Sequence, residues 1–75
     1  MTEYLIVIER AGNNYSAYSP DLPGCVATGA TLEEVRANTA GAIRMHIEGL
    51  KEDGLPIPQP AAIAERVSVD LGLLA

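Results

Sequence analysis

The sequence contains few of the residues that usually stabilise a small domain. Its 75 residues include no Trp, no Phe, one Cys and one His. A single Cys excludes an internal disulfide, and a structural metal site requires several Cys or His ligands. A chain of this length is expected to form one domain, residues 1–75, and to bury only a small core by itself. We therefore expect it to form a homo-oligomer, a dimer or a tetramer.

Positive charge is also scarce, with five Lys and Arg against ten Asp and Glu and a net charge of −5. Binding to a nucleic-acid backbone depends mainly on Lys and Arg, so a basic protein is a better partner for this chain than DNA or RNA. No positively charged leader precedes an apolar run, and the apolar residues 4–8 are too few for a signal core or a membrane span. We expect a cytoplasmic protein with a reduced thiol and no membrane contact.

Three short segments predict strands. Residues 3–9 (EYLIVIE) are apolar on both alternating faces, which predicts a central strand. Residues 11–14 (AGNN) predict a tight turn, after which residues 14–19 (NYSAYS) return as the second strand of a hairpin. Beyond a loop at residues 20–24, residues 25–28 (CVAT) predict a third antiparallel strand.

A long helix follows. Thr31 and Glu34 have the spacing of a capping box, in which the Thr side chain caps the first turn. The stripe expected to pack on the sheet comprises Leu32, Val35, Thr39, Ile43, His46 and Leu50. The helix is predicted to end near Asp53, because Gly54 is a common C-terminal residue and Pro56 cannot continue a helix.

The remaining residues predict an extended connector and a fourth strand. Residues 55–60 (LPIPQP) have the alternating prolines of a semi-extended segment. Residues 66–71 (RVSVDL) alternate apolar and polar side chains as a half-buried strand does, and Leu73 and Leu74 form either the end of that strand or a docking patch. The order β-β-β-α-β indicates an α+β fold, a small sheet with one long helix on one face.

The second face of this sheet also needs cover. Leu5 and Val7 make it apolar in the middle, so we expect pairing between subunits, either face to face or through the last strand.

The sequence offers few residues that could form a catalytic site. A nucleophilic Cys25 would need a base that lowers its pKa, but His46, the only histidine, lies in the apolar helix stripe. Glu3 and Glu9 stand about 20 Å apart along one strand, too far to share a metal ion with other acids such as Asp21, Glu33 and Asp70. Cys25 is better explained as a small buried side chain, and the acids as solvated residues.

Four motifs occur together in residues 15–60: Tyr-Ser-Ala-Tyr, Pro-Asp-Leu-Pro-Gly-Cys, Gly-x-Thr-x-x-Glu and Gly-x-Pro-x-Pro. In this combination the chain closely resembles the HicB-type antitoxin family, as a short HicB-like domain. The resemblance implies a partial RNase H-like fold in which the last strand runs parallel to the first. It also implies a non-enzymatic protein without cofactors that neutralises a HicA-type toxin, a small basic RNA-cleaving protein, by direct complex formation.

Two features depart from that family's fuller pattern. Many members carry a C-terminal DNA-binding module, whereas only about six residues follow Val69, so no direct DNA binding is expected. The first strand has no carboxylate in its middle, where an RNase H-like enzyme would hold a metal ligand, so nuclease activity is not expected either.

The residues expected to contact the partner are Asp21, Leu22, Pro23 and Gly24 in the loop, and Glu33 and Glu34 at the helix start. Cys25 and Thr31 are expected to be structural. Two alternatives stay open: an orphan oligomeric module that binds a small ligand or has a regulatory role without a toxin partner, and an enzyme that uses Cys25 or the carboxylates.

Overall fold

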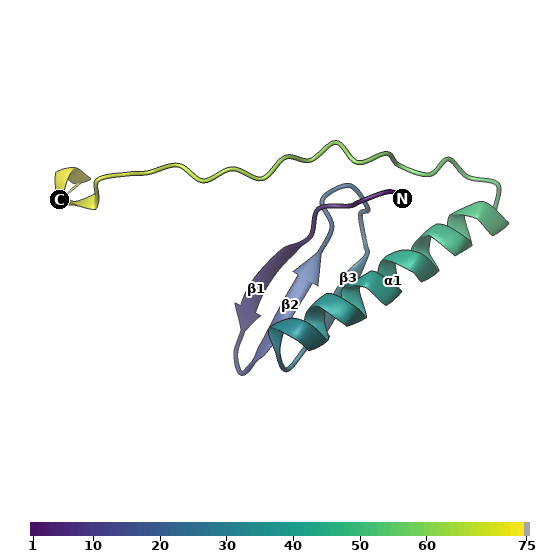
Figure 1. Ribbon diagram of the computed structural model, residues 1–75, viewed down its shortest axis with the longest axis horizontal. Coiled ribbons are helices and arrows are strands. Elements are labelled where there is room, and N and C mark those ends of the chain that lie inside the picture. The colour runs from purple at the N-terminus through teal and green to yellow at the C-terminus, as the bar shows by residue number, and fades with distance from the viewer. Residues whose placement is uncertain (75) are drawn as a thin grey trace.

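A computed structural model describes residues 1–74 as a three-stranded antiparallel sheet with one long helix (Figure 1). The elements in chain order are β1 (Val7–Ala11), β2 (Asn14–Tyr18), β3 (Val26–Gly29), α1 (Leu32–Glu52) and the short 3-10 helix η1 (Leu71–Leu74). The strand order is β1-β2-β3, and α1 packs on one face, mainly against β3 and β2. This arrangement confirms the α+β prediction.

The hairpin between β1 and β2 confirms the turn expected from Asn and Gly. Ala11 pairs with Asn14, which leaves Gly12 and Asn13 as a two-residue loop. Gly12 has φ of 64°, and no residue other than Gly has a positive φ among the described residues. A positive φ at only the first central position is the pattern of a type II′ turn, in which Gly is favoured.

The ends of α1 also follow the sequence. Thr31 is the N-cap, and its Oγ1 accepts a hydrogen bond of 3.0 Å from the Glu34 backbone amide. At the other end Gly54 has φ of 66° and donates its amide to the Lys51 carbonyl, while the Leu55 amide donates to the Leu50 carbonyl. These two bonds form a Schellman motif, so the helix ends where Gly54 permits the left-handed conformation.

The core between sheet and helix is small. Its buried side chains are the apolar Ala17, Leu22, Cys25 and Val35 and the polar Ser19 and Thr39. The helix comes very close to the sheet at Gly29, where an added Cβ would lie 2.5 Å from the Val35 backbone nitrogen. Gly29 therefore permits the close packing of α1 on β3.

The prediction that the first strand is central is wrong. β1 begins at Val7, four residues later than expected, and pairs only with β2 among the described residues. The strand is short because β2 ends at Tyr18, the partner of Val7, after which Pro20 directs the chain into a turn. The residues before Val7 consequently have no strand opposite them, and β1 forms an edge of the sheet.

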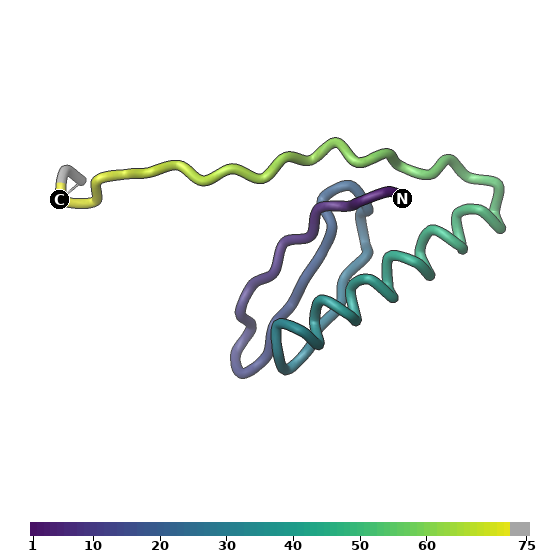
Figure 2. The backbone as a smooth tube through the Cα atoms, in the orientation of Figure 1, coloured from purple at the N-terminus to yellow at the C-terminus, as the bar shows by residue number. Residues whose placement is uncertain are grey.

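The predicted fourth strand is also wrong: residues 66–70 have no regular secondary structure and are exposed, and η1 follows them. The exposure of Leu73 and Leu74 lies outside the described part of the structure. Residues 55–71, which we term the C-terminal arm, are extended up to Asp70 and run across the top of the domain and beyond it (Figure 2). The radius of gyration is consequently 15.4 Å, against about 11 Å for a compact chain of this length. The alternating pattern favours a strand, but the described chain places no strand beside these residues.

No helix in the described residues is long and apolar enough to cross a membrane. Within the same part of the chain, no group of three or more His, Cys, Asp and Glu side chains is arranged to hold a metal ion.

Candidate functional site

The loop between β2 and β3 consists of two consecutive β-turns. The Leu22 amide donates to the Ser19 carbonyl, and the Cys25 amide donates to the Leu22 carbonyl, each over 3.1 Å. Leu22 is 0% exposed and Cys25 is 5% exposed, so both anchor the loop in the core. The loop is therefore held in one conformation by its backbone bonds and by two buried side chains.

The accessible tip of this loop is Pro23 followed by Gly24, both exposed. Pro23 occupies the second position of the second turn, and Gly24 has φ of 84° at the third, as a type II turn requires. A Cβ added at Gly24 would meet nothing within 4 Å. The tip exposes the Pro23 ring and the Gly24 backbone, and another molecule can approach this backbone closely.

Asp21 lies in the same loop but is half-buried and bonded within its own chain. Its carboxylate accepts hydrogen bonds from the Ala61 and Ala62 amides at 3.2 Å. Nearby, the Tyr4 hydroxyl donates to the Pro58 carbonyl over 2.7 Å. These bonds fix the base of the C-terminal arm against the loop and the N-terminal segment.

Glu33 and Glu34 are exposed in the first turn of α1, where acidic side chains interact favourably with the helix dipole. They are separated from the loop tip by the whole of β3, which is about 13 Å long at 3.3 Å per residue. The structure thus places the six predicted contact residues in two separate regions, with Leu22 buried beneath the tip.

An apolar row on the open face of the sheet was not identified among the predicted contacts. Val7 pairs with Tyr18, which pairs with Val26, so the three side chains share one face. Ala17, next to Tyr18, is buried on the opposite face under α1, whereas Tyr18 is 40% and Val26 is 58% exposed. The period-two alternation of residues 14–19 was the signal for this row.

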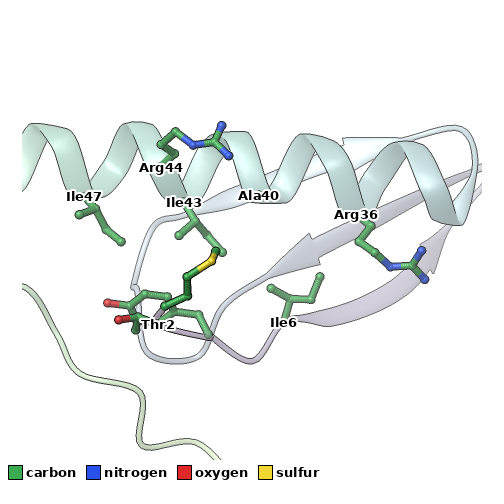
Figure 3. Close-up of a pocket in the computed structure, with 9 residues that line it drawn as sticks. Thr2, Ile6, Arg36, Ala40, Ile43, Arg44 and Ile47 are labelled. Atoms are coloured by element: carbon green, nitrogen blue, oxygen red, sulfur yellow. The ribbon is translucent and has the colours of Figure 1, made fainter.

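A second open apolar region lies between α1 and the N-terminal segment. Figure 3 shows Ile43 and Ile47 of α1 on one side of this groove and Ile6 on the other. Its volume is ≈ 410 Å³, and the lining includes the two basic residues Arg36 and Arg44. The groove exists because α1 packs mainly on β3 and β2 and leaves the region beside the N-terminal segment uncovered.

Cys25 and His46 line one shallow hollow beside Val26 and Met45, although the two residues are 21 positions apart in the sequence. Burial raises the pKa of the Cys25 thiol above its ordinary value of 9.0. A raised pKa keeps the thiol protonated, whereas a nucleophile requires the thiolate. The hollow therefore favours the structural role expected for Cys25.

Comparison with known proteins gives consistent results. The sequence profile of the family described as the HicB_like antitoxin of bacterial toxin-antitoxin systems matches residues 4–70. An uncharacterized 14.9 kDa protein of Haemophilus phage HP1 is 38% identical over 65 residues, which are 87% of this chain and 49% of that protein. The UPF0150 protein ssr1765 of Synechocystis is 33% identical over 67 residues, which are 88% of this chain and 85% of that protein.

A solved structure has a similar fold. It is a chain of the HicA3 and HicB3 toxin-antitoxin complex, with a TM-score of 0.70 and 33% sequence identity over 80% of this chain and 70% of that one. The present chain spans about half the length of the phage relative and most of the Synechocystis protein. With three antiparallel strands, one long helix and a family match over residues 4–70, this chain belongs to the HicB-like antitoxin family of bacterial toxin-antitoxin systems.

Proposed function

We propose that this chain is a non-enzymatic antitoxin that neutralises a small, basic, HicA-type RNA-cleaving toxin in the cytoplasm by forming a direct complex with it. The observation that carries the proposal is the fold shared with a chain of a HicA3 and HicB3 toxin-antitoxin complex at 33% identity. The net charge of −5 supports a basic partner, because opposite charges speed encounter and disfavour wrong partners. The same charge opposes direct binding to DNA.

Two exposed regions are the proposed contacts. Pro23 and Gly24 offer a rigid corner, and Glu33 and Glu34 offer negative charge at the other end of β3. Leu22 acts from beneath by holding the corner in place. Asp21 contributes through the bonds that fix the arm beside the loop.

The first step of the test is a search beside this gene for a short basic reading frame, which would be the candidate toxin. Co-expression with the present chain should restore growth and allow the two proteins to be purified together. A toxin that neither binds this chain nor loses toxicity would contradict the proposal, and the absence of such a frame would favour the orphan module.

The acidic contacts are tested by removing charge. Replacing both Glu33 and Glu34 by Gln should slow association with the toxin and reduce its dependence on salt concentration. The matched control replaces Glu48 and Glu52, two exposed acids of the same helix, by Gln. Equal effects of the two pairs on the association rate would show that net charge alone matters and that the helix start is not a contact.

The groove of Figure 3 supports a second candidate function, the binding of a small apolar molecule with a negatively charged end. Ile43 and Ile47 would contact the apolar part, and Arg36 or Arg44 the charge. Titration with medium-chain fatty acids, followed by chemical shifts of these residues, tests it. Saturable shifts that Ile47→Asp abolishes would support the small-ligand module, and unchanged spectra would contradict it.

A further inference from the structure

The C-terminal arm exposes apolar side chains at alternate positions. Val67 is 84% exposed, Val69 is 61% exposed and Leu71 is 75% exposed. These three side chains would lie on one face of a strand, with Ser68 and Asp70 on the other. Apolar side chains gathered on one side of an extended segment indicate a surface that becomes buried in an assembly.

The sheet has one unprotected edge. Within residues 1–74, β1 pairs only with β2 and β3 pairs only with β2. The β3 edge lies under α1, where the Asn38 side-chain amide donates to the Thr28 carbonyl over 2.8 Å. Beyond Val7, the outer edge of β1 has no such cover in this part of the chain, and an open edge is a template for another strand.

The arm does not close this edge within its own chain. Its base is fixed at Ala61 and Ala62 by Asp21, and residues 64–66 still lie near residues 5–7. Beyond this point β1 turns away from the arm, which continues past the sheet (Figure 1). The free part of the arm and the five residues of β1 have nearly the same length, about 17 Å for five residues.

We propose that residues 66–71 of the arm pair with the outer edge of β1 in a second copy of this chain, and that the two copies exchange arms reciprocally. A two-fold axis satisfies both edges at once, so the assembly closes as a dimer. Each sheet gains a fourth strand, and the valines of the arm become buried instead of exposed. This interface does not require a toxin and goes beyond the antitoxin function.

The charges of the two segments are compatible with this pairing. The β1 edge includes Glu9 and Arg10, and the exchanged part of the arm includes Arg66 and Asp70. Each segment thus carries one acid and one base, so neither sign is concentrated at the interface. A second copy also supplies the additional buried surface that a chain of 75 residues needs.

The mass of the full chain in solution is the first test. Light scattering should give twice the 7.9 kDa of one chain. Val69→Asp places a charge on the buried side of the arm and should raise the dimer dissociation constant at least ~10-fold. Ser68→Asp adds the same charge to the opposite side and should change this constant less than ~2-fold, since that side stays solvated. A monomeric wild type, or equal effects of the two variants, would overturn the proposal.

The location of the contact is the second test. A photo-reactive benzophenone residue replaces Ser68, and chains labelled with 14N and 15N are mixed before irradiation. Crosslinks between unlike isotopes should map to β1, Val7–Ala11. Crosslinks only between like isotopes would show that the arm folds onto its own edge, and crosslinks to α1 would show a different surface; either result would overturn arm exchange. Neither test contains a toxin, so failure of the antitoxin function does not affect them.

Discussion

The hydrogen bonds between Asp21 and the C-terminal arm allow a quantitative prediction of how often the base of the arm opens. Asp21→Ala removes the carboxylate whose oxygens accept hydrogen bonds from the Ala61 and Ala62 amides. Hydrogen bonds to charged groups contribute about 1.5–3 kcal/mol when buried, and the half-exposed carboxylate reduces this to about 1–2 kcal/mol for the pair. Opening of the arm base should therefore become about 5- to 30-fold more frequent, at 1.4 kcal/mol per tenfold.

Amide hydrogen exchange measures this change residue by residue. Protection of Ala61 and Ala62 should fall by that factor, whereas protection of Val35 in the core should stay the same because Leu22 still anchors the loop. Glu65→Ala removes an equal charge from the arm and is the control. Unchanged protection of the two alanines in Asp21→Ala, or an equal loss in Glu65→Ala, would refute the role of this carboxylate.

Three further predictions concern stability, measured by urea denaturation. Gly29→Ala should destabilise the protein by about 3 kcal/mol, because its Cβ would lie 2.5 Å from the Val35 backbone nitrogen. Gly41→Ala has open space around the new Cβ and should stabilise the protein by about 0.5–1 kcal/mol. Similar effects of the two variants would contradict the close packing of α1 on β3. The Ser19 hydroxyl is buried without a hydrogen bond in the described residues, so Ser19→Ala should stabilise the protein by about 1 kcal/mol. A loss of stability would show that the hydroxyl has a hydrogen-bond partner. The raised pKa of Cys25 means that the unfolded chain releases this proton first, so the free energy of unfolding should decline as the pH rises through 9.0. This part of the decline should be missing in Cys25→Ser, and an unchanged pH dependence would contradict the burial of the thiol.

Local rules account for the parts of the fold that were predicted correctly. The cap at Thr31, the stop at Gly54 and the turn at Gly12 each depend on a few neighbouring residues. Such boundaries are readable because the backbone conformation and the residue type are coupled directly. Burial of Cys25 was predicted from its residue type and from the position of His46, the only histidine, in the apolar stripe of the helix.

The predictions that were wrong or incomplete concern contacts between segments that are distant in the sequence. The apolar pattern of residues 3–9 gave no information on how long β2 would remain beside it, and that length decided that β1 is an edge strand. In the same way, no local signal connects Asp21 to Ala61, 40 residues away. The predicted contact list therefore combined an exposed tip with a carboxylate that is bonded to the arm.

The C-terminal arm shows that an alternating apolar pattern in the sequence is not sufficient to form a strand. Alternation at Val67, Val69 and Leu71 specifies which sides of the segment are apolar and polar, but the hydrogen bonds of a strand come from a neighbour. The chain supplies an open edge at β1 and holds the arm so that it passes this edge. In the proposed dimer, a second copy supplies the same edge to the first arm. The wrong prediction of a fourth strand and the proposed exchange of arms thus have the same origin in this pattern. If the arm stays free, Ser68→Asp and Val69→Asp should have equal effects on self-association. If the arm becomes a strand in a second copy, Val69→Asp should weaken the dimer far more than Ser68→Asp.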